Sequence, residues 1–359
     1  MKGLLSPQGS ASHSEAPSPR LRNEELLQEL LGRRIVLIED WERLETEERR
    51  AILEAPDRKT VLSLMVEAGL INYYQAGRIE AGTLFGLVMG NYRVLSRLGA
   101  GGMGIVFKAE HVMLRRQVAI KVLPLSPDQP TALLIRFYRE VRAIAQLVHP
   151  NIVAAIDAGE LIGDDPDDPI LHYFVMEYVP GQDLEQYVIE RGCLDIGLAC
   201  DLIQQAASAL AEAHKHQMIH RDVKPSNLLI TPEGQAKLLD FGLARTYSTR
   251  VTEPGTVLGT LDYIAPEQIN AAGTVDGRAD IYSLGGTLFW CLAGRTPFPP
   301  QKSMAQDLAI RLTQPPPSIR AVRPDVPEEL DAILRRMMAV DREQRFASPA
   351  EVRQALLPW

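Results

Sequence analysis

One eight-residue string constrains this chain more than any other feature: residues 220–227 read His-Arg-Asp-Val-Lys-Pro-Ser-Asn. Asp222 can accept a proton from an attacking hydroxyl and orient its oxygen. Lys224 can neutralise charge on a phosphoryl group during transfer, and Asn227 can ligate a metal. We expect His220 to be a packed, hydrogen-bonded support rather than a base. A match of this length has little chance of being accidental, so the string predicts a phosphoryl-transfer site.

A second carboxylate follows at a distinctive spacing. Asp240-Phe241-Gly242 comes 13 residues after Asn227, directly behind the strand-like run Ala-Lys-Leu-Leu. Asp-Phe-Gly alone is a common turn tripeptide, but at this spacing the Asp240 carboxylate is a candidate oxygen ligand for Mg²⁺.

Two further acidic residues are expected to support the structure. Glu267, in the run Ala-Pro-Glu, is predicted to form a buried ion pair, with Arg345 as its partner. Asp280 is predicted to cap backbone donors around the string at 220–227.

A glycine-rich loop precedes these motifs. Its glycines let the backbone approach phosphate oxygens and donate N–H groups to them. A dinucleotide-binding turn shares the spacing but should open a helix, whereas a second strand-like run follows here, so we expect a hairpin. The nucleotide-contact candidates in this loop are Leu98, Gly99, Ala100, Gly101, Gly102, Met103 and Gly104.

Lys121 ends the apolar run Val-Ala-Ile, 17 residues after Gly104. At that distance it can reach phosphates beneath the loop and hold α/β-phosphate oxygens as a point charge. Glu140, on the helical pattern that follows, could pair with it. The alternatives without a function are that Lys121 is a solvated lysine at a strand edge and that Glu140 lies on a solvated helix face. The arginines around Glu140 support the second alternative.

Taken together, residues 92–353 resemble the eukaryotic-like (Hanks-type) serine/threonine protein kinases, in the bacterial branch. The resemblance rests on the phrases GAGGMGIVFKAEH, HPNIV, HRDVKPSN and GTLDYIAPEQ. It implies an α+β, two-lobed kinase fold with a small β-rich N-lobe and a larger helical C-lobe. ATP would lie between the lobes, with Mg²⁺ on Asn227 and Asp240 and Mn²⁺ as a substitute.

The resemblance also implies how the adenosine part of ATP is held. Met176 would guard the back of the adenine pocket, and backbone groups of Glu177 and Val179 would bind the adenine. Asp183 would contact the ribose or the substrate. The apolar walls implied for the adenine are Val106, Ala119 and Leu229.

Lys224 bears on the acceptor, because the pattern HRDxKPxN is typical of serine/threonine kinases. The implied activity is transfer of the ATP γ-phosphoryl group to Ser/Thr hydroxyls of proteins, in signal transduction. A nucleotide-binding pseudokinase is the alternative from another class, disfavoured because no catalytic position is degraded. A small-molecule phosphotransferase is disfavoured by Lys224 and by the Ala-Pro-Glu segment.

The segment between Asp240 and Glu267 is predicted to switch the enzyme on by autophosphorylation. Thr252 is the first choice of phosphosite and Thr256 the second. A phosphate there carries about −1.5 to −2 charges and could pair with Arg221. The alternative to phosphorylation is that these hydroxyl groups only cap turns.

The chain around this domain is predicted to comprise a disordered tail (1–20), a helical docking module (21–90), and kinase lobes at 91–179 and 180–356. Leucines at helical spacing predict three or four short helices in the module. Residues 21–60 hold 8 basic and 11 acidic residues, a net −3, so a DNA-reading helix pair is disfavoured and a protein partner favoured. We expect deletion of residues 1–88 to leave phosphorylation of a generic peptide within about an order of magnitude of that by the full chain.

Charge and composition argue against several other classes of protein. The net charge of −8 gives no electrostatic case for nucleic-acid binding. No stretch free of charged residues exceeds 14 residues, and a membrane helix needs about 20. Three cysteines without a CxxC pair indicate free, buried thiols rather than a disulfide framework or zinc site. The expected location is the cytoplasm, for a soluble kinase or for a piece of a longer membrane-anchored one.

Overall fold

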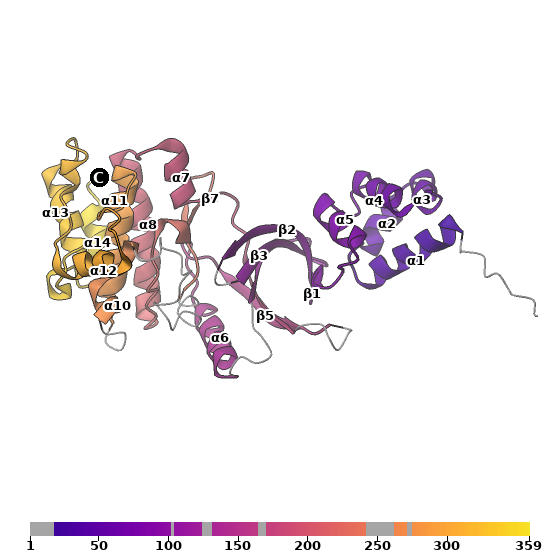
Figure 1. Ribbon diagram of the computed structural model, residues 1–359, viewed down its shortest axis with the longest axis horizontal. Coiled ribbons are helices and arrows are strands. Elements are labelled where there is room, and N and C mark those ends of the chain that lie inside the picture. The colour runs from indigo at the N-terminus through magenta and orange to yellow at the C-terminus, as the bar shows by residue number, and fades with distance from the viewer. Residues whose placement is uncertain (1–17, 102–103, 124–130, 164–169, 242–261, 271–274) are drawn as a thin grey trace, which may run out of the picture. The chain divides into compact units, whose positions relative to one another are not determined.

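Figure 1 shows the computed structural model of the chain. The structure describes residues 18–101, 104–123, 131–163, 170–241, 262–270 and 275–359. The chain divides into two compact units, one formed by the residues up to 96 with 108–116, the other by 97–107 with 117–359.

The first unit begins with five short helices, where the sequence predicted three or four, and we call residues 19–80 the helical cap. The helices are α1 (Pro19–Gly32), α2 (Ile38–Arg43), α3 (Thr46–Leu53), α4 (Arg58–Glu67) and α5 (Tyr73–Glu80). Local sequence sets their ends. Ser18 accepts a hydrogen bond from the Leu21 N–H at the start of α1, and Asn72 and Gln75 form a reciprocal capping box at α5. Gly69, with φ of 72°, lies between α4 and α5 in the left-handed conformation that often follows the end of a helix.

The cap has its own hydrophobic core, built on the predicted leucine spacing. Leu26, Leu27 and Leu30 are buried, and Leu31 packs against them from the edge. Side chains from the later helices complete the core, among them Ile52, Val61, Leu62, Met65, Leu70 and Ile79. Burial of each large apolar side chain contributes about 1.5–3 kcal/mol.

Arg93 binds the cap to the strands that follow it. This buried side chain lies on β2 (Tyr92–Gly101), which pairs with β1 (Val88–Met89). Its Nη1 donates to the carbonyl oxygens of Ile35 (3.1 Å) and Leu70 (3.2 Å). Its Nη2 donates to Glu110 Oε2 (3.0 Å) on β3 (Gly104–His111).

Amides of α5 reinforce this connection. The Asn72 side chain donates to the Leu95 carbonyl at 2.8 Å, and the buried Gln75 side chain donates to the Val94 carbonyl, also at 2.8 Å. Arg115 adds two hydrogen bonds to Asp40, of 2.9 and 3.1 Å. The compact unit that contains the cap therefore extends to residue 96.

Six strands are hydrogen-bonded in the order β1-β2-β3-β4-β6-β5. The remaining three are β4 (Gln117–Leu123), β5 (Ala155–Leu161) and β6 (Leu171–Glu177), and α6 spans Thr131–Ile144. The strand-like runs and the single helical pattern of this region are confirmed. In the antiparallel β4–β6 ladder, Ala119 lies opposite Met176.

The rest of the chain is mostly helical, as the implied α+β kinase fold requires. Its helices are α7 (Leu184–Arg191), α8 (Ile196–Lys215), α10 (Pro266–Asn270), α11 (Arg278–Ala293), α12 (Met304–Thr313), α13 (Glu328–Met337) and α14 (Pro349–Leu356). A small sheet joins β7 (Gln182–Asp183), β8 (Leu228–Ile230) and β9 (Ala236–Leu238) in that order. The 3-10 turns are η1 (Pro225–Asn227), η3 (Ile319–Ala321) and η4 (Arg342–Gln344).

Helix α11 runs through the centre of this part and is buried along almost its whole length. Gly285 permits close packing there, because a Cβ atom at this position would lie 2.7 Å from Met338 Cγ. α11 therefore provides a fixed base for the residues described below.

The cysteine prediction holds for two of three residues. Cys200 and Cys291 are buried free thiols, and burial raises the pKa of Cys200 to about 12. Cys193 is exposed, so its predicted burial is wrong; it follows Gly192, where α7 has already ended. Among the described residues, no helix combines the length and apolar character needed to cross a membrane.

His149 gives the fold a pH dependence. Its Nδ1 accepts a hydrogen bond from the Asn151 N–H (3.1 Å), and its Nε2 lies 3.1 Å from Ser208 Oγ. Burial is the main cause that lowers the pKa of His149, with Lys215 adding to it and Glu212 opposing it. Protonation would also remove the Nδ1 lone pair that accepts the bond.

We therefore expect the free energy of unfolding to fall as pH drops below about 6.5, because the unfolded chain takes up this proton before the folded chain does. The loss should stay below about 1 kcal/mol, since the ring keeps some solvent contact. Denaturant unfolding between pH 7 and pH 5 should show a shallower decline in His149→Gln than in the wild type. Parallel curves for His149→Gln and the wild type would contradict the assignment.

Candidate active site

Asp280 on α11 anchors the residues that open the eight-residue string. Its fully buried carboxylate accepts hydrogen bonds from the backbone N–H groups of His220 (2.9 Å) and Arg221 (2.7 Å). His214 Nε2 lies 2.7 Å from the same carboxylate. Arg221 has φ of 67°, a conformation that costs energy for a non-glycine residue and therefore needs such an anchor. The predicted capping role of Asp280 is confirmed.

His220 supports the turn, as predicted. Its Nε2 lies 2.6 Å from the Leu239 carbonyl oxygen, and its Nδ1 accepts from the Asp222 N–H at 3.3 Å. The ring also packs against Phe241, with centroids 4.7 Å apart. Both ring nitrogens are engaged by backbone groups, so the imidazole holds the loop in place.

The structure brings Asp222, Lys224 and Asn227 together. Lys224 Nζ lies 3.0 Å from Asp222 Oδ2. The Asn227 amide nitrogen donates to the same Oδ2 (2.9 Å) and to the Asp222 carbonyl oxygen (2.7 Å). Turn η1 sets this geometry, because Pro225 fixes the backbone one residue after Lys224. Asp222 is thereby held in one orientation by a cation and an amide.

A second pair joins β4 to the segment after β9. Lys121 Nζ, buried on β4, donates to Asp240 Oδ2 at 2.8 Å. Asp240 has φ of 57° and remains partly open to solvent. The phosphate-binding candidate thus lies directly beside the metal-binding candidate. The pairing of Lys121 with Glu140, which lies on α6, stays a prediction.

The oxygen donors at this site fit Mg²⁺. Asn227 uses its amide nitrogen in the bonds to Asp222, which leaves the amide oxygen as its metal-ligating atom. Asp240 supplies a carboxylate, and Mg²⁺ is usually bound by one or two carboxylates together with substrate phosphates. In the part of the chain that the structure describes, no three His, Cys, Asp or Glu residues gather as an all-protein metal site.

The glycine loop connects two strands, as predicted, rather than opening a helix. Leu98, Gly99 and Gly101 belong to β2, and Gly104 begins β3 with φ of 117°. Only glycine adopts that angle readily, so Gly104 is required where the chain turns back.

The adenine-wall candidates share one hydrophobic cluster. Ala119, Met176 and Val179 are buried in it, and Val106 and Leu229 pack against it. Asp183 lies opposite Leu229 in the β7–β8 ladder, and its carboxylate caps α7 by accepting from the Gln186 N–H (2.9 Å). Contacts of these residues with a nucleotide stay predictions.

The predicted pair between Glu267 and Arg345 is confirmed. Arg345 Nη1 and Nη2 donate to the two carboxylate oxygens of Glu267, at 2.6 and 2.9 Å. The buried guanidinium also donates to three backbone carbonyls, those of Ala339, Arg278 and Val340. A buried arginine with all these partners fixes the start of α10.

Comparisons with known proteins agree with this geometry. Residues 92–357 match the family described as the protein kinase domain. This chain belongs to the protein kinase family. Its relatives include serine/threonine-protein kinase PrkC of Bacillus subtilis, 37% identical over 266 residues, and serine/threonine-protein kinase PknB of Mycolicibacterium smegmatis, 39% identical over 270 residues. Both alignments cover 74% of this chain, but only 40% and 42% of the respective relative.

Solved kinase structures are similar as well. The crystal structure of the PknI kinase domain of Mycobacterium tuberculosis has a TM-score of 0.58 and 31% sequence identity to this chain. The similarity covers 76% of this chain and 98% of that one. The kinase fold, in the bacterial serine/threonine branch, therefore accounts for strands β2 to β6 and the helical part that follows them, whereas β1 precedes the matched residues.

Some predicted kinase site residues lie outside the described residues. These are Gly102, Met103, Thr252 and Thr256. Of the Asp-Phe-Gly motif, the structure describes Asp240 and Phe241, with Phe241 buried.

Sequence reasoning missed three polar contacts around the kinase motifs. Gln268 donates to the Arg221 carbonyl at 2.9 Å, and buried Arg311 pairs with Asp262 at 2.5 Å. Lys237 pairs with Glu177 at 2.9 Å. Only Lys237 gave a signal, because it stands inside an otherwise apolar strand pattern.

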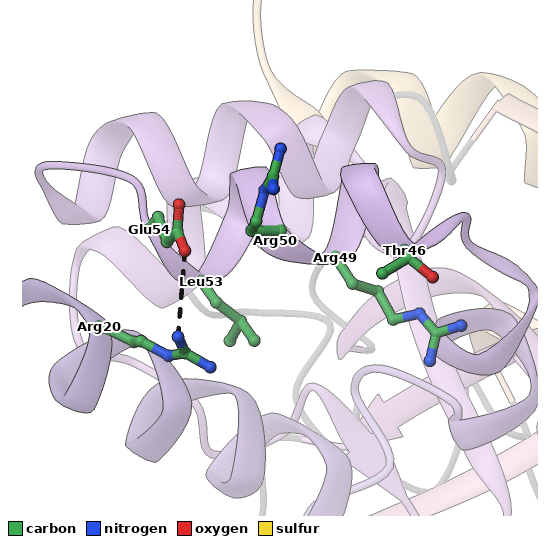
Figure 2. Close-up of a pocket in the computed structure, with 6 residues that line it drawn as sticks. All are labelled: Arg20, Thr46, Arg49, Arg50, Leu53 and Glu54. Carbon is green, nitrogen blue, oxygen red and sulfur yellow. Dashed lines mark ion pairs between the residues drawn. The ribbon is translucent and has the colours of Figure 1, made fainter.

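A hollow of about 320 Å³ on the helical cap belongs to the first unit, whereas every catalytic candidate lies in the second. It is lined by Arg20, Thr46, Arg49, Arg50, Leu53 and Glu54 (Figure 2). Arg20 is paired with Glu24 (2.9 Å) and Glu54 (3.9 Å), and the three arginine side chains point in different directions. We assign no chemistry to this hollow.

Proposed function

We propose that this chain is a serine/threonine protein kinase that transfers the γ-phosphoryl group of ATP to hydroxyls of protein side chains. The observation that carries the proposal is the catalytic cluster Asp222–Lys224–Asn227, with its 3.0 and 2.9 Å contacts. The proposal covers this chain alone, which spans 40% of the length of PrkC.

Each residue of the site has a separate role in phosphoryl transfer. Asp222, held by Lys224 and Asn227, orients the acceptor hydroxyl and accepts its proton. Lys224, 3.0 Å from that carboxylate, is placed to stabilise charge on the phosphoryl group in transfer. Lys121 positions the phosphates from the β4 side. A Mg²⁺ ion on Asp240 and Asn227 would supply neutralisation of the phosphate charge.

Labelled ATP tests the proposal. The full chain, incubated with ATP, Mg²⁺ and a generic protein such as casein, should label the protein, and chelation of the metal should abolish the label. Binding of ATP without labelling of any protein would favour the pseudokinase alternative. Labelling of a small metabolite alone would favour the small-molecule phosphotransferase.

Activation by phosphorylation at Thr252 and Thr256 belongs to the same proposal. Both residues lie outside the described residues, but their proposed partner Arg221 is described. Its buried Nε has no hydrogen-bond partner among the groups that the structure describes. An unpaired buried guanidinium nitrogen is costly, so an arriving phosphate would satisfy it.

We expect a Thr252→Ala/Thr256→Ala double variant to lose activity by roughly 5–150-fold, the usual range for a coupling between two sites. Mass spectrometry of the wild-type chain expressed alone should find phosphate on this segment, and an inactive Asp222→Asn chain should lack it. Equal phosphorylation of the inactive chain would assign the modification to another kinase. Full activity of the double variant would refute the switch.

We also propose a partner for the helical cap and a cellular location for the kinase domain. We infer a protein partner for the helical cap, because residues 39–48 form a mostly exposed acidic run on it and the net charge of −8 disfavours nucleic acid. A cytoplasmic location is proposed for this kinase domain, where ATP and the protein acceptors are available.

A further inference from the structure

Lys237 and Glu177 form an ion pair that the catalytic scheme does not use. Lys237 Nζ lies 2.9 Å from Oε1 and 3.0 Å from Oε2 of Glu177. The side chains are only 12% and 26% exposed. A pair this sheltered is less screened than an ordinary surface pair, so its loss should have a measurable effect.

The pair lies where three chain segments meet, namely β9, residues 151–154 and the end of β6, and we call this junction the seam. Residues 151–154 run between β9 and the end of β6. On one side, the Leu238 N–H donates to the Asn151 carbonyl (2.8 Å), and the Val153 N–H donates to the Leu238 carbonyl (3.0 Å). On the other side, the Glu177 N–H donates to the Ala154 carbonyl at 2.9 Å.

The Glu177 carboxylate also belongs to this seam, because its Oε2 accepts the Ala154 N–H at 3.3 Å. That bond is long, so Lys237 is the main partner of the carboxylate. Without Lys237, the half-buried Glu177 carboxylate would keep, among the donors that the structure describes, the long bond from Ala154, and the end of β6 would be free to shift.

Both residues lie beside the expected adenine site, because Lys237 stands opposite the adenine-wall candidate Leu229 in the β8–β9 ladder. Glu177 belongs to residues 176–179, which we call the strap, and its backbone is expected to bind adenine. Lys237 lies three residues before Asp240, the metal-ligand candidate, whose carboxylate accepts the hydrogen bond from Lys121. The ion pair therefore links the expected adenine-binding residue Glu177 to the strand that leads to Asp240.

We propose that Lys237 is a positioning residue for nucleotide binding, which holds Glu177 and with it the adenine-binding strap in the binding-ready geometry. The inference rests on the proposed function, since it requires that ATP occupies this site. Because the strap is ordered before ATP arrives, binding does not have to supply the cost of ordering it.

Direct binding of Mg²⁺·ADP, measured by titration calorimetry on the full chain, tests this without requiring turnover. Lys237→Met keeps the length of the side chain but removes its charge, and should raise Kd about 3- to 10-fold. Lys237→Arg keeps the charge and should restore Kd to within about twofold of the wild type. Glu177→Gln should match Lys237→Met, and the double variant should add nothing further.

Lys215→Met is the matched control. Lys215 pairs with Glu212 at a similar distance, 2.8 Å, but is 71% exposed and lies on α8. Its removal should leave Kd unchanged. In steady-state assays, Lys237→Met should raise KM for ATP by the same factor as Kd and leave kcat and the peptide KM within about twofold.

The possible outcomes distinguish the positioning role of Lys237 from the proposed kinase function. An unchanged Kd in Lys237→Met, with a lowered melting temperature, would reduce the pair to a structural contact and overturn the inference. Failure of Lys237→Arg to restore Kd would overturn the role of the charge. A wild-type chain that binds nucleotide but transfers no phosphate would overturn the proposed function while leaving the Lys237 comparison valid. A wild-type chain that binds no nucleotide would overturn both.

Discussion

Replacing Asp222 with asparagine should slow phosphoryl transfer by about 10²- to 10⁴-fold, the usual contribution of a positioned general base. An amide cannot take the proton of the acceptor hydroxyl. An amide oxygen is also a weaker acceptor for Lys224 and the Asn227 amide, both of which donate to the present carboxylate. Nucleotide affinity should change by less than about threefold, because Lys121 and Asp240 are untouched. Single-turnover kinetics at saturating ATP measures the chemical step.

Asp201→Asn provides the matched control for that experiment. Asp201 is an exposed aspartate on α8 that accepts a hydrogen bond from Gln205 at 2.9 Å. Its replacement should leave the single-turnover rate within about twofold of the wild type. Wild-type turnover by Asp222→Asn would show that the catalytic base has been misassigned.

Replacing Arg93 with methionine should lower the free energy of unfolding by about 3–5 kcal/mol, the usual result of removing one partner of a buried ion pair. The change leaves the Ile35 and Leu70 carbonyls without their donor and leaves the Glu110 carboxylate without its closest cation. Methionine fills much of the same volume, so the effect reports the lost hydrogen bonds rather than a cavity.

Urea unfolding of the full chain measures this loss. Arg43→Met is the control, because Arg43 is 76% exposed and its pair with Asp40 is a surface contact of 3.4 Å. Its loss should cost less than about 1 kcal/mol. Equal stability of Arg93→Met and the wild type would contradict the role of Arg93 in binding the helical cap to the strands that follow it.

The same contacts change the expectation for truncation. The sequence predicted that deletion of residues 1–88 leaves phosphorylation of a generic peptide within about an order of magnitude. In the structure, such a cut removes the Ile35 and Leu70 carbonyls that Arg93 binds, and the Asn72 and Gln75 amides that bind Leu95 and Val94. We now expect the truncated chain to lose stability rather than only a docking site.

The sequence was informative where chemistry restricts residue choice. Asp222, Asn227 and Asp240 could be assigned because only certain side chains accept a proton or ligate a hard cation, and their spacing was distinctive. The structural roles of Asp280 and Arg345 followed from the same motifs. Strands and the main helices were predictable because their apolar residues repeat with the period of each element.

The missed features depend on side chains that bond to backbone atoms far away in the chain. Arg93 reaches carbonyls at residues 35 and 70, and no sequence period marks such a contact. Helix α2 is six residues long, highly charged and without a buried residue, so it lacks the apolar pattern that predicts a helix. The exposure of Cys193 depends on where α7 ends, and element boundaries are set by tertiary packing.

Phosphosite mapping of a generic protein, incubated with the full chain and Mg²⁺·ATP, tests the central claim most directly. The account predicts new phosphate on serine and threonine side chains, in amounts that fall by at least about 10²-fold with the Asp222→Asn chain. Phosphate confined to tyrosine, or equal incorporation with the Asp222→Asn chain, would contradict it.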